Sequence, residues 1–258
     1  MLGFARAQVF GRCGGMALHY LSAIVTGQVK ELGPAGRQHL RFWPKHLSTA
    51  PPRQVRARDG RRPALIYTDG SEETEGVGIE TVLLDPETSI PNDFMIGQPS
   101  KNGVEPNPGR EAFGGMVPEV IVESWKSTGK KSRVIHQAEL LPAKLALDLW
   151  APRLEGRRVI VFIDNAAAEG ALVRGASASE PSAQIVGRFW ETATRFTLDV
   201  WIARVPSKSN PADGPSRGDW EWTDRWGFAR VVPNSWSSRR NGGRTQDQER
   251  SETQQKRR

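Results

Sequence analysis

The sequence has little cysteine: Cys13 is the single one among 258 residues. This count excludes an intramolecular disulfide framework and a zinc site built from cysteines, and it favours a reducing intracellular compartment, nuclear or cytoplasmic. Long apolar runs are also missing. None approaches the roughly 20 residues that span a bilayer, so we expect no membrane partner. The stretch through Val25 is poor in acids and carries Arg6 and Arg12, but glycines and polar residues break the amphipathic pattern of a transit peptide.

Positive charge is scarce in the centre of the chain and concentrated at its flanks. The net charge is +7, and residues 1–62 hold 11 Lys and Arg against 2 Asp and Glu. Residues 237–258 hold 7 against 3, which leaves a net charge of −6 for residues 63–236. This distribution suggests an acidic, metal-binding core with arms for a polyanion, and solvated, disordered flanks are the alternative. The sequence predicts a basic arm at 1–62, a folded domain at 63–218, a Trp-rich extension at 219–236 and a disordered tail at 237–258.

Hydrophobic patterning predicts an α/β domain with a mixed sheet and helices on its faces. Pro142 is tolerated in a first helical turn, so we expect its helix to begin near Gln137, with Glu139 in that turn. We expect Trp190 and Trp201 to lie in the core rather than to stack on bases. Apolar runs predict strands at 64–68, 77–84, 112–117, 159–163 and 199–205. Helical spacing predicts helices at 118–125, 136–150, 165–174 and 181–197. Composition predicts a surface insertion at 86–110 and a loop at 206–218.

Four short motifs each carry one carboxylate at a strand end, at a helix start or in a loop. Each has an ordinary structural explanation as a turn residue, a helix cap or a partner of the helix dipole. Four carboxylates brought together would repel one another and would need divalent cations between them, which is the basis of a two-metal phosphodiester hydrolase. The motifs are IYTDGS at 66–71 with Asp69, QAEL at 137–140 with Glu139, FIDN at 162–165 with Asp164, and NPAD at 210–213 with Asp213.

These motifs, together with RVPSKSNPADGPSR at 204–217, resemble the type 1 ribonuclease H domain family in the form attached to retroelement reverse transcriptases. The likeness covers about residues 63–217, and 204–217 is similar to the end of the ribonuclease H domain of hepadnavirus polymerases. It implies a ribonuclease H-like mixed five-stranded sheet with helices on both faces. The basic arm resembles the connection that joins a reverse transcriptase to its ribonuclease H, so a reverse transcriptase domain is an expected partner. No polymerase motif is visible in the sequence.

The resemblance implies cleavage of the RNA strand of RNA–DNA hybrids with two Mg²⁺ ions, or Mn²⁺ in their place. Two ions about 3.5–4 Å apart activate water and stabilise the leaving oxygen. Asp69 and Asp164 are the expected central ligands. Glu139 would hold one ion together with the 2′-hydroxyl that distinguishes RNA from DNA, and Asp213 would complete the other ion. Phosphate-binding candidates are Ser71, Asn165, Ser207 and Asn210, and Lys126, Lys130 and Lys131 form a basic stretch that either grips the hybrid or is a solvated loop.

The chain departs from the family pattern at the loop before the last carboxylate. Many members have a mobile histidine there, thought to assist product release, whereas this loop reads Ser207-Lys208-Ser209 and no histidine follows His136. The insertion at 86–110 is also longer than in compact members. These departures keep a second hypothesis open, a catalytically silent nucleic-acid-binding module with the same fold. A related nuclease that acts on DNA is a third.

Overall fold

The computed structural model describes residues 12–28, 30–31, 33–49, 60–88, 107–128 and 134–232. Most of the predicted insertion, Lys130, Lys131 and the predicted tail at 237–258 lie outside these residues. Of the helices within them, none is both long enough and apolar enough to cross a bilayer.

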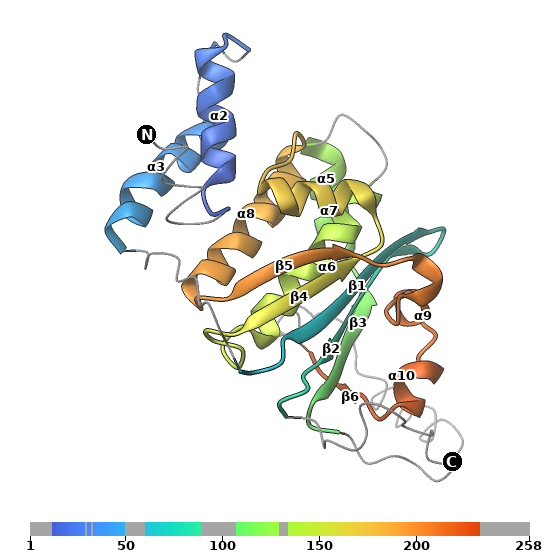
Figure 1. Cartoon of the computed structure of the whole chain (residues 1–258). Coiled ribbons are helices and arrows are strands. Elements are labelled where there is room, and N and C mark those ends of the chain that lie inside the picture. The colour runs from blue at the N-terminus through green and yellow to red at the C-terminus, as the bar shows by residue number, and fades with distance from the viewer. Residues whose placement is uncertain are drawn as a thin grey trace, which may run out of the picture.

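A six-stranded mixed sheet forms the centre of this structure (Figure 1), in the order β5-β4-β1-β2-β3-β6. The first three strands form an antiparallel meander, whereas β4 runs parallel to both β1 and β5, and β6 runs parallel to β3. The strands are β1 (Ala64–Glu73), β2 (Gly76–Leu84), β3 (Arg110–Met116), β4 (Arg158–Ile163), β5 (Asp199–Arg204) and β6 (Ala229–Arg230).

Alternation along the strands gives each face of the sheet its own hydrophobic cluster, because successive side chains point to opposite faces. Ile66 of β1 and Leu83 of β2 belong to a large cluster on one face. Their neighbours Tyr67 and Val82 contribute to a smaller cluster on the other face. Both faces of β1 and β2 are therefore packed.

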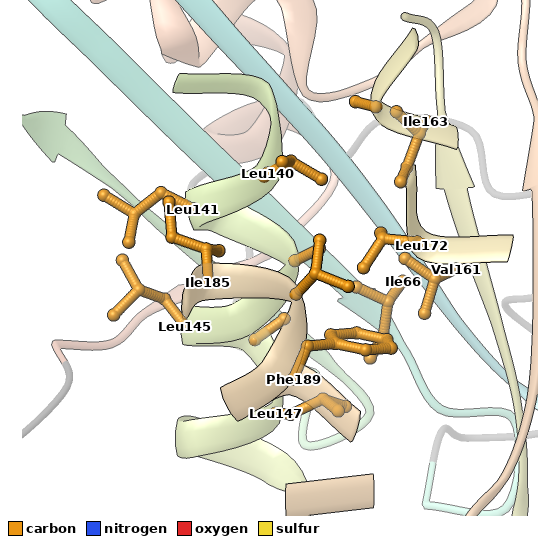
Figure 2. Close-up of a cluster of buried hydrophobic side chains, with 14 of the residues drawn as sticks. Ile66, Leu140, Leu141, Leu145, Leu147, Val161, Ile163, Leu172, Ile185 and Phe189 are labelled. Atoms are coloured by element: carbon orange, nitrogen blue, oxygen red, sulfur yellow. The ribbon is translucent and has the colours of Figure 1, made fainter. Parts of the chain in front are cut away.

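Helices cover the face that carries the large cluster. Figure 2 shows how Leu140 of one helix and Phe189 of another pack against Ile66 and Val161 of the sheet. Full burial of such a side chain stabilises the fold by about 1.5–3 kcal/mol. The helices are α5 (Glu119–Thr128), α6 (Ile135–Trp150), α7 (Ala166–Arg174) and α8 (Glu180–Arg195).

The segment after β5 covers the opposite face of β2 and β3. It contains the short helices η2 (Ser207–Ser209), α9 (Asp213–Ser216) and α10 (Glu221–Arg225). Ala212 and Phe228 are buried in the smaller cluster, and Trp220 and Trp226 pack against it. The Trp-rich segment thus forms a satellite core over one half of this face.

The basic amino-terminal residues contribute two helices, α2 (Gly15–Val25) and α3 (Pro34–Thr49). Cys13, Ala17 and Trp43 are buried in the same large cluster as the sheet. The Arg12 guanidinium lies 5.1 Å from the ring centre of Trp190 on α8 and donates a hydrogen bond to the Val173 carbonyl. These helices therefore pack on the domain, and the division at residue 62 stays a prediction.

The predicted α/β class, with a mixed sheet and helices on both faces, is confirmed, but the predicted number of strands is wrong. The structure has six strands because the chain after α10 adds the two-residue β6 beside β3. The predicted strand at 64–68 continues to Glu73, since β2 pairs with β1 beyond Thr68. The predicted loop at 206–218 contains η2 and α9.

Two further predictions about individual positions are wrong. The helix α6 begins at Ile135, so Pro142 is its eighth residue and Glu139 lies beyond its first turn. Trp201 is 68% exposed, because alternation on the edge strand β5 turns it away from the core; Trp190 is buried, as predicted.

Candidate metal centre

Three of the four predicted carboxylates lie together in the structure. Asp69 comes from β1, Glu139 from α6 and Asp164 from the residue that follows β4. One carboxylate oxygen of each lies within 4.8 Å of those of the other two. Asp69 and Glu139 are buried, and Asp164 is partly exposed, so the cluster is accessible from one side.

The register of the sheet explains why the two aspartates meet. Parallel pairing between β1 and β4 ends at the pair Thr68 and Ile163. Asp69 and Asp164 are the next residue on each strand, where the two strands are no longer paired. A crevice outside the carboxyl ends of parallel strands is the usual ligand site of such sheets.

A glycine brings the third carboxylate to this point. A Cβ atom at Gly70 would lie 2.4 Å from the carbonyl carbon and oxygen of Ala138, and 2.7 Å from the Glu139 nitrogen. The backbone of β1 can therefore touch the backbone of α6 only where no side chain intervenes. This contact places Glu139 beside Asp69. It also falls one turn before Pro142, which has no N–H to donate to the Ala138 carbonyl.

Burial and mutual repulsion disfavour the ionised form of the carboxyl groups in this cluster. Burial raises the pKa of Asp69 to about 7, and repulsion from Asp164 and Asp213 acts in the same direction. Burial raises the pKa of Glu139 to about 9, with repulsion from Asp164 and Asp69 added to it. Without a cation, Glu139 therefore stays mostly protonated at neutral pH, and the pKa of Asp69 lies close to neutral pH.

Ser216 is a residue of the site that the motifs did not single out. Its hydroxyl donates a hydrogen bond of 2.5 Å to Asp69 Oδ2, and this bond opposes the rise in the pKa of Asp69. Ser71 in turn donates to the Ser216 carbonyl, and a Cβ atom at Gly78 would lie 2.1 Å from that carbonyl oxygen. The one signal for Ser216 in the sequence is its place inside the family-like segment 204–217.

The fourth predicted ligand, Asp213, lies next to the cluster and outside the group of three. It begins α9, and its side chain is 41% exposed and forms an ion pair of 3.5 Å with Arg217. It is near enough to Asp69 to raise the pKa of that carboxyl. Its assignment as a ligand stays a prediction.

The predicted phosphate-binding side chains fall into different environments. Ser71 is buried against α9, and Asn210 is buried with its Nδ2 donating to the Thr68 carbonyl at 3.0 Å. Asn165 caps α7, since its Oδ1 accepts hydrogen bonds from the Ala167 and Ala168 amides. Ser207 is exposed in η2. Their roles toward a substrate stay predictions. Within the structure, Asn210 fixes the loop that follows β5 to the end of the β1–β4 pairing.

The three carboxylates fit a divalent cation such as Mg²⁺. All donors are hard oxygens, which Mg²⁺ prefers. Glu139 Oε2 is buried without a hydrogen-bond partner among the described residues. A cation at this point would satisfy that oxygen and would remove the repulsion that raises the two pKa values.

Comparisons with known proteins found low similarity to solved ribonuclease H structures. No protein-family model matches the chain, and no curated protein matches it significantly. Ribonuclease H1 from the halophilic archaeon Halobacterium salinarum NRC-1 is 17% identical, with a TM-score of 0.38, over 59% of this chain and 92% of that one. The N-terminal RNase H domain of rv2228c from Mycobacterium tuberculosis is 14% identical, with a TM-score of 0.38, over 58% and 88%. At these values neither likeness indicates an activity for this chain.

Proposed function

We propose that the chain is a divalent-metal-dependent endonuclease that hydrolyses the RNA strand of RNA–DNA hybrids. The observation that carries the proposal is the convergence of Asp69, Glu139 and Asp164 within 4.8 Å at the edge where β1 and β4 separate. The motif order in the sequence supports the choice of substrate. The resemblance of the motifs to ribonuclease H domains of retroelement reverse transcriptases adds a retroelement origin and a reverse transcriptase partner to the proposal.

The residues of the cluster have separable tasks. Asp69, Glu139 and Asp164 would hold the cations, with Asp213 beside them. When bound, two Mg²⁺ ions supply an activated water and charge stabilisation for the leaving oxygen. Ser216 orients the Asp69 carboxylate through its hydrogen bond, as outer partners of ligating carboxylates do. Glu139 would accept a hydrogen bond from the 2′-hydroxyl, the group that separates RNA from DNA.

The test is a cleavage assay with four labelled duplexes of one sequence: the hybrid labelled on its RNA strand, the hybrid labelled on its DNA strand, duplex RNA and duplex DNA. We expect Mg²⁺-dependent cleavage of the RNA strand in the hybrid alone. Asp164→Asn should lower the rate by more than about 100-fold, because even outer partners of a metal cost 10–100-fold when they are removed. Asp224→Asn is the matched control, since that carboxylate is exposed and paired with Arg230.

Each other outcome of this assay contradicts the proposal in a different way. Cleavage of duplex DNA would assign the related DNA nuclease. Tight binding of the hybrid without cleavage would assign the silent module. Full activity of the Asp164→Asn chain would mean that the chain cleaves hybrids without using the carboxylate site.

A further inference from the structure

One half of the sheet face opposite the large cluster is not covered by the short helices that follow β5. α9 packs against β1, β2 and β3, and Figure 1 shows β4 and β5 at the front, with α6 behind them. Trp201 on β5 is 68% exposed there, and its neighbours on this face are partly exposed. We call this surface the open sheet face; its residues are Ile160, Phe162, Trp201 and Ala203, and Leu65 and Tyr67 of β1 form its border with the covered half.

Aromatic rings dominate the part of the open sheet face nearest the carboxylates. Tyr67 and Phe162 are cross-strand partners whose rings stack with centroids 4.6 Å apart and planes 11° from parallel. The next residue in that row is Ala203, the partner of Phe162 on β5. The Ala203 methyl group is small, so no large side chain lies beside the Phe162 ring on β5. Trp201 lies two residues before Ala203 on the same face of β5.

The open sheet face is continuous with the candidate metal centre. Tyr67 lies two residues before Asp69, and Phe162 lies two residues before Asp164. Two residues of a strand advance about 7 Å. A nucleic-acid strand whose phosphate lies at the carboxylates therefore has the aromatic row within reach of its adjoining nucleotides.

The charges at the border of the open sheet face suit a polyanion. Arg158 begins β4 on this face and Lys208 lies in η2, and both are exposed. Arg204 at the end of β5 is also exposed, but alternation turns it to the other face. Asp199 is the cross-strand neighbour of Arg158. Rings flanked by cations are how proteins hold unpaired bases, since every base has a flat face to stack. Paired bases in a hybrid are already stacked inside the duplex, whereas unpaired ends are not.

We propose that the open sheet face binds unpaired bases of a strand that continues beyond the hybrid held at the carboxylates. Trp201 supplies the exposed stacking surface, and the Tyr67–Phe162 pair forms the floor next to the site. This inference rests on the proposed function for the placement of the hybrid. It predicts a substrate with a single-stranded extension, such as a junction between a hybrid and an unpaired strand.

The test measures binding by fluorescence anisotropy at one salt concentration, because nucleic-acid affinity depends steeply on salt. The Asp164→Asn chain, which should not cut, is titrated with a blunt hybrid, with the same hybrid carrying an unpaired extension on the RNA or the DNA strand, and with a single strand. We expect tighter binding of one extended hybrid than of the blunt one. Adding Trp201→Ala should remove about 5- to 100-fold of that preference and leave blunt binding unchanged.

Two further variants make the result specific. Trp201→Phe should retain most of the preference, since a ring remains. Val120→Ala should retain all of it, because Val120 is an equally exposed apolar side chain on α5, at 69% against 68% for Trp201.

The inference and the proposed function fail in different ways. Equal affinity for blunt and extended hybrids, in a wild-type chain that cleaves hybrids, would overturn the inference alone. The inference alone would also be overturned if the chain dimerised through Trp201 in analytical ultracentrifugation and its nucleic-acid affinity did not depend on Trp201. A chain that cuts no hybrid but binds the single strand through Trp201 would support the open sheet face and refute the proposed function.

Discussion

Glu80 is a buried carboxyl group that the proposed site does not use. It is the cross-strand partner of Asp69 on one side and of Gly114 on the other. Both of its carboxyl oxygens are buried without a hydrogen-bond partner in the part of the chain that the structure describes. A Cβ atom at Gly114 would lie 1.7 Å from Glu80 Oε2, so the glycine provides the space for this carboxyl. Burial raises the pKa of Glu80 to about 10, against an ordinary value of 4.5.

Replacing this carboxyl by an amide should change how stability depends on pH. Because the pKa is raised in the folded chain, folding takes up a proton between pH about 4.5 and about 10. The stability that the protonated group permits is complete below pH 4.5 and is lost as the pH rises toward 10. Glu80→Gln removes this loss, so its stability relative to wild type should increase from pH 5 to pH 9, by at most about 1.4 kcal/mol per pH unit.

Urea unfolding of both chains at pH 5, 7 and 9 measures that difference. Glu123→Gln is the control, since Glu123 is exposed on α5 and paired with Lys126. Parallel pH profiles for wild type and Glu80→Gln would show that Glu80 is already ionised in the folded chain.

Residue patterns predicted the carboxylates better than their partners. Asp69, Glu139 and Asp164 stand in motifs with a family-like order, and the structure gathers them. Ser216 could not be chosen in the same way, because its role depends on where α9 lies over β1. The sequence pattern places Trp201 in the core, but the residue is exposed. An aromatic residue in an alternating strand can face either side of the sheet, and the pattern does not reveal which side is left uncovered by helices.

At the scale of elements, the contact between β1 and α6 holds the site together. The sequence predicts both elements, but the predicted end of β1 and the predicted start of α6 differ from the structure. A strand was expected to stop at an Asp-Gly turn, yet its partner β2 continues to Gly76 and extends it to Glu73. A proline was expected to mark a helix start, yet tertiary packing keeps α6 helical on both sides of Pro142. Local turn and breaker preferences are weak beside such packing.

Gly70→Ala tests this contact. The added methyl group would overlap the Ala138 carbonyl, so β1 and α6 must separate. We expect a loss of about 1–3 kcal/mol in the free energy of unfolding, and a fall in hybrid cleavage of about 100-fold, because a misplacement of about 1 Å in a catalytic group costs that much.

Gly60→Ala is the matched control, since a methyl group there meets nothing within 4 Å and Gly60 has an ordinary φ. Thermal unfolding and the cleavage assay are measured on both variants. A Gly70→Ala chain with wild-type stability and activity would mean that the close approach of the two backbones is not required.

At the scale of the whole molecule, the amino-terminal helices share the core of the sheet domain. Trp43 of α3 is 3% exposed, and Ala17 of α2 and Cys13 just before α2 are also buried. The charge of residues 1–62 predicts an arm, and charge reports on surface residues. Trp43 lies too far along the chain from Cys13 and Ala17 for a local pattern to connect them. One cooperative unit is therefore the expectation for α2, α3 and the sheet.

Trp43→Ala tests this expectation. Truncation of a buried tryptophan costs about 3–5 kcal/mol, and this loss should lower the unfolding temperature of the entire chain in a single calorimetric transition. Trp222→Ala, at a side chain that is 41% exposed, should cost less. A second transition that stays at the wild-type temperature would show that residues 1–62 are an independent appendage.

The claim that joins these scales is that Asp69, Glu139 and Asp164 hold a divalent cation. Crystals grown with Mn²⁺, measured at an energy where manganese scatters anomalously, test it most directly. We expect an anomalous peak within about 2–2.6 Å of carboxylate oxygens from all three residues, the range of hard-cation ligation, and no such peak in Glu139→Gln crystals. Well-ordered wild-type crystals with no peak between these carboxylates would contradict it.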